Sequence, residues 1–221
     1  YFDSTPMVAI TGNVPVNMLG RDSFQEIDIT GVTMPMTKHN YMVKDVNDLA
    51  DTLREAFQVA ISGRPGPVLV DIPKDVQISS CEYIKKDRML PRPFPAVREA
   101  DVDKAADAIR RSRRPCIYSG GGVVGAGAEK ELMRLADLID APICTSMMGL
   151  TALPHDHPRF LGMMGMHGRY AATKAMSECD LLIAVGVRFS DRATGDKFKF
   201  SNGKTVLHID IDAAEISKNI G

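Results

Sequence analysis

Several short stretches carry residue types from which a nucleotide-binding site can be built. Gly120–Gly125 reads G-G-G-V-V-G and fits the G-x-G-x-x-G pattern after an apolar run. Backbone amides of such a turn, at the start of a helix, can bind a phosphate. The same glycines would also serve a tight strand-to-helix turn with no ligand. The pattern alone leaves both interpretations open.

Two arginines and an aspartate follow other apolar runs. Arg188 and Arg192 come after Leu181–Val185, where they could bind a pyrophosphate or form a surface network with neighbouring aspartates. Asp210 ends the next such run and could accept hydrogen bonds from ribose hydroxyls. Asp212 suits the cap of a following helix, and a purely capping role for both aspartates is the alternative.

Two more polar clusters and the cysteines complete the inventory of reactive groups. Gly165–Gly168, G-M-H-G, offers free amides and an imidazole at a helix start, or is a loop with a core methionine. His155–His157 suits no standard metal motif, so we expect a solvated loop and no metal site. The four cysteines form no C-x-x-C pair, which favours reduced thiols in a cytoplasmic protein.

The stretch Ser62–Val76, S-G-R-P-G-P-V-L-V-D-I-P-K-D-V, shows how charged residues are positioned by a strand. Glycines and prolines precede an unbroken apolar run, which is typical of a strand covered on both faces. Arg64 then lies at the entrance of this strand, with Asp71 and Lys74 at its exit. Strand ends of parallel sheets are where ligands dock, so we expect these charges to matter.

The chain divides into two alternating series of strands and helices. The first contains a strand at Pro6–Gly12, a helix capped by Asp45 and the strand Val68–Ile72. Residues 77–100 are charged and rich in proline, which favours an extended connection. We therefore predict the end of one domain at 1–76, a linker at 77–100 and a second domain at 101–221.

The second series predicts a doubly wound, Rossmann-like α/β domain. Asp101 or Asp103 would cap its first helix. Its other elements are expected at the strand Pro115–Ser119, a helix around Leu132–Ile139, the strand Pro142–Thr145, a loop rich in Pro and His, the helix Tyr170–Glu178, and the strands Leu181–Val185 and Thr205–Ile211. The predicted fold class is α/β, with parallel sheets flanked by helices.

The composition weighs against several functional classes. A chain of 221 residues with a net charge of -1 gives no electrostatic reason to expect nucleic acid or a membrane surface as partner. No apolar run approaches the roughly 20 residues of a membrane helix. The sequence contains no G-x-S-x-G, Walker lysine or H-E-x-x-H motif. The residues alone thus indicate a nucleotide-binding α/β protein.

Several stretches, taken in order, resemble the large catalytic subunit of acetohydroxyacid synthase, also called acetolactate synthase. They are I-T-G-N-V-P at Ile10–Pro15, G-R-D-S-F-Q-E at Gly20–Glu26, T-K-H-N-Y at Thr37–Tyr41, the stretch Ser62–Val76, M-G-M-H-G at 164–168, G-V-R-F-S-D-R-A-T-G at 186–195 and H-I-D-I-D at 208–212. The resemblance implies a thiamine-diphosphate enzyme, with Mg²⁺, that decarboxylates pyruvate and adds the hydroxyethyl unit to a second 2-keto acid. It also implies a role in branched-chain amino-acid synthesis, a homodimer of large subunits and a regulatory small subunit.

The same resemblance assigns roles to individual residues. Phe24 and Gln25 match a pair that contacts the reaction intermediates, while Lys74, with Pro15 and Met166, lines the substrate channel. The central domain would hold FAD, which takes no net redox part. The matching FAD contacts are Arg64, Gly121, Gly122, Ser146, Met147, Met166, His167, Gly186, Arg188, Arg192, Asp210 and Ile211. Ser23 and Ser190 depart mildly from the usual family text.

The resemblance also implies that parts of the active site lie outside this sequence. The catalytic glutamate and the G-D-G motif for metal and diphosphate are expected elsewhere, and no G-D-G occurs here. We therefore expect a fragment, inactive alone, that covers the end of the pyrimidine-binding domain and the central domain. The alternatives are a related FAD-containing carboligase of the glyoxylate type and a non-catalytic nucleotide-binding module.

Overall fold

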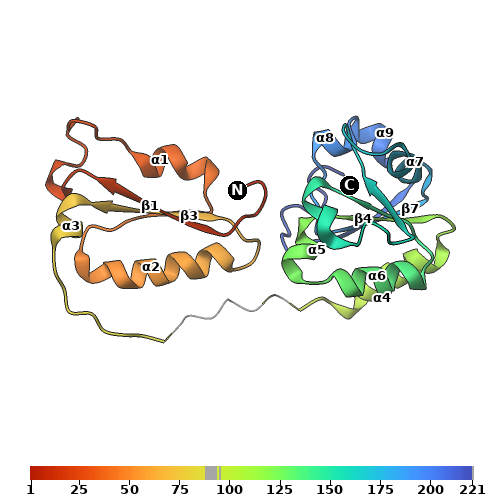
Figure 1. Ribbon diagram of the computed structural model, residues 1–221, viewed down its shortest axis with the longest axis horizontal. Helices are drawn as coiled ribbons and strands as arrows, with labels where there is room; N and C mark the ends of the chain where they lie inside the picture. The colour runs from red at the N-terminus through yellow and green to blue at the C-terminus, as the bar shows by residue number, and fades with distance from the viewer. Residues whose placement is uncertain (88–93, 95, 221) are drawn as a thin grey trace. The chain divides into compact units, whose positions relative to one another are not determined.

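The computed structural model describes residues 1–87, 94 and 96–220. The chain forms two compact units, Tyr1–Phe94 and Pro95–Gly221, each with its own parallel sheet (Figure 1). The predicted fold class, α/β with parallel sheets and flanking helices, is confirmed. The division between the units falls within the predicted linker, although helices occupy both ends of that segment, up to Ile78 and from Glu99.

The first unit has a three-stranded sheet in the order β1-β3-β2. Its elements are β1 (Met7–Asn13), η1 (Val16–Met18), α1 (Ile29–Thr33), η2 (Met34–Met36), β2 (His39–Met42), α2 (Val46–Ile61), β3 (Pro67–Pro73) and α3 (Lys74–Ile78). The central strand β3 is buried along its whole length, which explains the apolar run Val68–Val70. Helices α1 and α2 lie on opposite faces of this sheet (Figure 1).

Helix α2 is fixed at both ends by side chains. Asp45 caps its start by accepting a hydrogen bond from the amide of Asn47 at 2.9 Å, as predicted. At its end, the ammonium of Lys38 donates to the carbonyl of Val59 at 2.5 Å and to that of Ser62. Burial lowers the pKa of Lys38. These contacts bring a positively charged donor to carbonyl groups at the C-terminal end of the helix, where the helix dipole favours a cation.

The second unit has a five-stranded sheet in the order β6-β5-β4-β7-β8. Its elements are α4 (Glu99–Arg111), β4 (Pro115–Ser119), α5 (Gly121–Ala126), α6 (Glu129–Leu138), β5 (Ile143–Thr145), η3 (Met147–Ala152), β6 (Phe160–Met163), α7 (Tyr170–Glu178), β7 (Leu181–Val185), α8 (Asp191–Thr194), α9 (Lys197–Ser201) and β8 (Thr205–Ile209). The helices α4, α5 and α6 cover one face, and α7, α8 and α9 the other (Figure 1). Two core clusters, one on each face, fill the space between sheet and helices.

The strand order creates a topological switch point. From β4 the chain proceeds to β5 and β6 on one side, then crosses to β7 and β8 on the other. The loops that follow β4 and β7 therefore leave the sheet in opposite directions. In open α/β sheets, ligands bind in the crevice at the carboxyl ends of such strands.

Several sequence predictions of elements need correction. Neither Asp101 nor Asp103 caps α4, which begins at Glu99, and Asp101 instead pairs with Arg98 at 2.7 Å. The segment predicted as a loop contains β6, a short edge strand whose pairing with β5 is irregular, with Gly162 at a φ of +92°. The sequence of this segment has only a weak strand pattern, in keeping with its irregular pairing. The predicted last strand ends at Ile209 instead of residue 211.

Candidate functional site

The turn after β4 packs against the loop after β7. The amide of Gly122 donates to the carbonyl of Gly186 at 2.9 Å, and Gly186 has a φ of +55°. A Cβ added at Gly122 would lie 2.6 Å from the Cα of Gly186. This close backbone approach by itself requires the glycines. Contact of Gly121 and Gly122 with a cofactor stays a prediction.

The last glycine of the G-x-G-x-x-G pattern does not behave as the dinucleotide fingerprint requires. In that fingerprint the third glycine allows close helix–strand packing. Here a Cβ added at Gly125 would meet nothing within 4 Å, and α5 has only six residues. The steric demands of this turn therefore favour the tight-turn interpretation of the pattern.

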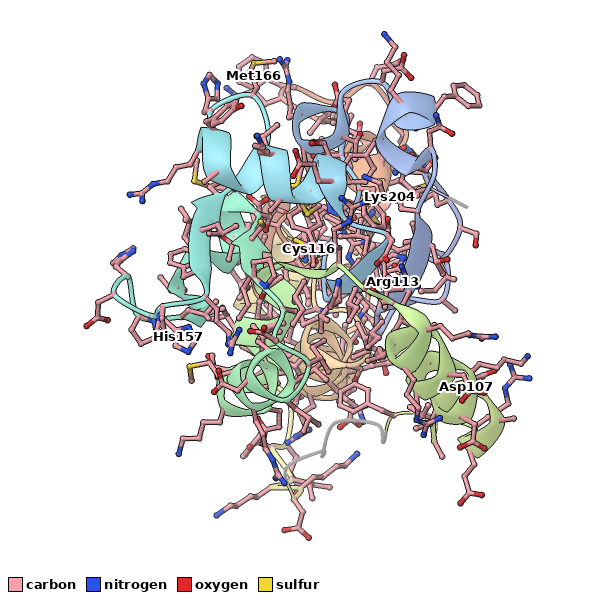
Figure 2. The ribbon with its side chains drawn as sticks, turned by 90° about the vertical axis from the view of Figure 1, so that its right-hand side faces the viewer. Asp107, Arg113, Cys116, His157, Met166 and Lys204 are labelled. Carbon is pink, nitrogen blue, oxygen red and sulfur yellow. The ribbon has the colours of Figure 1, made fainter. Side chains whose placement is uncertain are left out.

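The structure brings Met166 and Arg192 together. The amide of Met166 donates to the carbonyl of Arg192 at 3.0 Å, and the Arg192 guanidinium lies 3.8 Å from the Met166 sulfur. Met166 is 63% exposed and projects from one end of the second unit (Figure 2). Arg188, in the loop after β7, is half-buried. Met166 and Arg192, two predicted contacts from distant segments, thus meet at the carboxyl edge of the sheet.

Asp210 lies directly after β8, and its side chain is 9% exposed. One carboxyl oxygen accepts a hydrogen bond from the amide of Asp212 at 2.9 Å. Asp212 in turn caps the next turn by accepting from Ala214 at 3.0 Å, although the residues described there form turns and no helix. One carboxyl oxygen of Asp210 therefore helps to cap this turn, and the second oxygen takes no part in that hydrogen bond.

The remaining predicted contacts in this unit line the same edge. Ser146 and Met147 follow β5, His167 lies beside Met166, and Ile211 follows Asp210. Met147, Met166 and Ile211 are large apolar side chains with substantial exposure. Guanidinium groups, a carboxyl group and exposed apolar surface on one edge suit the pyrophosphate, ribose and flat ring of a flavin dinucleotide.

Buried polar atoms lie beneath this edge, and the sequence pattern gives no prediction of them. Within the part of the chain that the structure describes, the Tyr118, Ser119 and Thr145 hydroxyls and His208 Nδ1 are buried without hydrogen-bond partners. Burial raises the pKa of Tyr118. These residues lie inside apolar strands, where a polar side chain is the only sequence signal.

A second candidate region lies at the carboxyl edge of the first unit. Phe24 is 88% exposed, and the next residue, Gln25, has a φ of +60°. Glu26 holds this loop by accepting from the amides of Gly20 and, at 3.0 Å, Ser23. These hydrogen bonds, that of Gly20 first, lower the pKa of Glu26. A non-glycine residue in this conformation is a form of strain that is common at functional sites.

Asp71 anchors the start of the same loop. Its carboxyl group is fully buried and accepts hydrogen bonds from Thr11 at 2.8 Å and from Asn13 at 2.6 Å. The Asn13 side chain also contacts the carbonyl of Ile27 at 3.5 Å and accepts from Val14 at 2.9 Å. The sequence pattern indicates Asp71 only as a charge at the strand exit, and its burial assigns it a structural role.

Lys74 and Arg64 lie at opposite ends of β3. Lys74 is exposed at the start of α3, and its neighbour Asp75 accepts from the amide of Val16 at 3.1 Å, which brings Pro15 to the same corner. Arg64 donates to the Ser4 hydroxyl at 2.9 Å. Contact between Arg64 and a cofactor in the second unit stays a prediction.

Two further kinds of feature concern metal binding and membrane insertion. No group of three or more His, Cys, Asp or Glu side chains among the described residues could hold a metal ion. His157 accepts a hydrogen bond from the amide of Arg159 at 3.3 Å. None of the helices in the described part of the chain is long and apolar enough to cross a membrane.

Comparison with known proteins places these features in a family. Residues 102–221 match the family described as "Thiamine pyrophosphate enzyme, central domain". The chain is 48% identical over 226 residues to the probable acetolactate synthase large subunit of Methanocaldococcus jannaschii, covering 100% of this chain and 38% of that protein. It is 48% identical over 219 residues to the acetolactate synthase large subunit of Corynebacterium glutamicum, covering 98% of this chain and 35% of that protein.

These matches confirm the resemblance that the sequence motifs indicated. The similarity extends over both units, while the chain spans little more than a third of the length of these curated relatives. The whole five-stranded Rossmann-like sheet lies within the residues that the family match covers. Of the helices around it, only α4 begins before the match. The chain therefore belongs to the thiamine pyrophosphate enzyme family and carries that family's central domain.

Proposed function

We propose that this chain is part of an acetolactate synthase large subunit. The observation that carries the proposal is that similarity to such subunits covers 98–100% of the chain, including the loop with Phe24 and Gln25. Thiamine diphosphate, bound with Mg²⁺, would supply the electron sink that allows pyruvate to lose CO₂ and its two-carbon unit to join a second 2-keto acid. The chain's own residues would orient the substrates.

In this proposal the first unit contributes side chains to the reaction site. Phe24 would pack against the substrate carbon skeleton, because its ring is exposed while its loop is held rigidly by Glu26. Gln25 would donate a hydrogen bond to a substrate oxygen. Lys74, exposed at the start of α3, would attract the anionic keto acid on approach.

The second unit is proposed to hold FAD at the carboxyl edge of its sheet. Arg188 and Arg192 would bind the pyrophosphate, and Asp210 would accept hydrogen bonds from a ribose. Met147, Met166 and Ile211 would provide apolar surface, with His167, Ser146 and the glycine turn adjacent. Full-length protein that is purified in the presence of FAD and shows no bound flavin absorbance would contradict this assignment.

The remaining parts of the proposal concern the complete enzyme. We propose that the catalytic glutamate and the metal–diphosphate motif are supplied by polypeptide outside these 221 residues, so that this chain alone makes no acetolactate. We propose a homodimer of large subunits with a regulatory small subunit. A cytoplasmic location is supported by four cysteines that are all free thiols.

Product analysis of the full-length protein tests the activity. With thiamine diphosphate and Mg²⁺ we expect acetolactate from pyruvate. A protein that condenses glyoxylate and leaves pyruvate unchanged would instead be the related carboligase, and one that uses neither would be a non-catalytic module.

A substitution in the first unit tests the role of its loop. Phe24→Ala should lower kcat/KM for pyruvate by about tenfold or more, because small losses of substrate positioning are costly. Its stability should not change, because the ring is 88% exposed. Phe198→Ala is the matched control, since that ring is 89% exposed on α9 in the other unit. Equal activity of both variants would show that Phe24 does not belong to the reaction site.

A further inference from the structure

His208 lies between two parts of the candidate cofactor site. It is opposite Ala184 in the pairing of β8 with β7, the strand that leads into the arginine-bearing loop. Its side chain is only 7% exposed. The imidazole packs edge-on against Phe189, with ring centroids 5.1 Å apart at an interplanar angle of 67°. A buried imidazole beside an aromatic ring needs a reason other than apolar packing.

The hydrogen bonds of His208 supply that reason. Its Nε2 lies 3.0 Å from the carbonyl oxygen of Val187, and because a carbonyl can only accept, Nε2 must carry a proton and donate. Nδ1 is buried with no partner among the residues that the structure describes. A leucine here would avoid that unpaired nitrogen but would leave the Val187 carbonyl without this donor. The Nε2 contact is therefore what an imidazole adds at this position.

Val187 is the centre of a loop held from two sides. Its neighbours Gly186 and Arg188 are both predicted cofactor contacts. From the β4 side, Gly122 donates to the carbonyl of Gly186 at 2.9 Å. From the β8 side, His208 donates to the carbonyl of Val187. The amide of Gly186 also donates to the carbonyl of Ile209, next to β8, at 2.8 Å. Loss of the His208 contact would therefore release the Val187 carbonyl, one residue before Arg188, while Gly186 stays paired.

The same imidazole borders the carboxyl group after β8. His208 Nε2 lies 3.8 Å from Asp210 Oδ2, which is beyond direct hydrogen-bond distance but within van der Waals reach of the ring. The other carboxyl oxygen of Asp210 is occupied by the amide of Asp212. The ring thus lies against both the arginine-bearing loop and the acidic group.

We propose that His208 is a positioning residue for dinucleotide binding. Its Nε2–H fixes the Val187 carbonyl, and so holds Arg188 at the distance from Asp210 at which the guanidinium and the carboxyl group bind the pyrophosphate and ribose of one ligand. This inference rests on the proposed binding of FAD by this unit.

The test compares FAD affinity among variants of the full-length apoprotein, by equilibrium quenching of flavin fluorescence at a temperature well below unfolding. His208→Leu and His208→Asn should each weaken FAD binding about tenfold, since neither can donate to the Val187 carbonyl. His208→Gln, whose amide nitrogen reaches about as far as Nε2, should restore affinity to within about threefold of wild type. Tyr118→Phe is the control, because it removes another buried, unpaired polar atom on the same face.

Each outcome separates the positioning role from simpler ones. Leu and Asn variants that melt earlier but bind FAD as wild type does would show a purely structural histidine and overturn the proposal. A Gln variant as weak as Leu would overturn the role of the donor. If the Leu variant does not fold, the comparison of Asn with Gln decides in the same way. A wild-type protein that binds no flavin would instead refute the proposed cofactor, and with it this inference.

Discussion

Asp180 fixes the turn between α4 and β4 at the amino edge of the second unit's sheet. Its carboxyl group accepts from the Ser112 hydroxyl and from the amides of Arg113 at 2.9 Å and Arg114 at 3.0 Å. These contacts, with Ser112 first, lower the pKa of Asp180 to about 2. Because the folded pKa is below the ordinary value of 3.8, the stabilisation is present above pH 4 and is lost as the pH falls toward 2.

Asp180→Asn should remove the part of the pH dependence of folding stability that comes from this carboxyl group. The variant should be less stable than wild type at pH 6, and the difference should shrink as the pH falls from about 4 to about 2. Urea denaturation across this range measures it, with Asp156→Asn as an exposed loop control. A difference that stays constant down to pH 2 would show that the hydrogen bonds do not depend on ionisation.

The cysteines divide into one accessible and three buried thiols. Cys81 is exposed, whereas Cys116, Cys144 and Cys179 are buried, and Cys116 is enclosed near the middle of the second unit (Figure 2). The neighbouring Cys144 thiol raises the pKa of Cys116, and burial raises that of Cys179 to about 11. We expect one fast-reacting thiol in the native chain at pH 8, absent in Cys81→Ser, and three more after unfolding. Rapid alkylation of Cys116 under native conditions would contradict this burial.

At the level of elements, the Gly186 loop tests the packing at the switch point. Gly186→Ala places a Cβ 2.7 Å from the Cα of Gly122 and forces a φ of +55° on a side chain. We expect a loss of about 2 kcal/mol or more, part of it from the left-handed conformation. Gly125→Ala is the matched control, since its Cβ meets nothing within 4 Å inside α5 and should be neutral or stabilising. Equal stability of both variants in urea would refute the packing argument.

The elements also show what the sequence could and could not predict. β4, α7 and β7 lie at the predicted residues, because long apolar runs and clear helical spacing mark them. β6 was not predicted as a strand, because its four residues include a glycine at positive φ and form an edge of the sheet. Arg188 and Asp210 were predicted as cofactor contacts because they follow strands. His208 and the structural role of Asp71 were not predicted, because burial and partners depend on neighbours distant in sequence.

At the scale of the molecule, the core clusters indicate two separately stabilised units. One cluster, around Val68 and Val70, draws its members from the first unit, and the other two draw theirs from the second. A three-stranded sheet buries less apolar surface than a five-stranded one, so we expect the first unit to unfold at lower urea concentration. Hydrogen exchange read by mass spectrometry can follow peptides from each unit separately.

Substitutions confined to one unit make this prediction specific. Asp71→Ala should destabilise the first unit by about 1–3 kcal/mol, because the Thr11 and Asn13 side chains lose their acceptor. Gly186→Ala should destabilise only the second. If the units are independent, each variant shifts the transition of its own peptides, and the double variant shows both shifts unchanged. A single transition that moves as a whole in either variant would mean that the units unfold cooperatively, and the stability of the cofactor edge would then depend on the loop that carries Phe24.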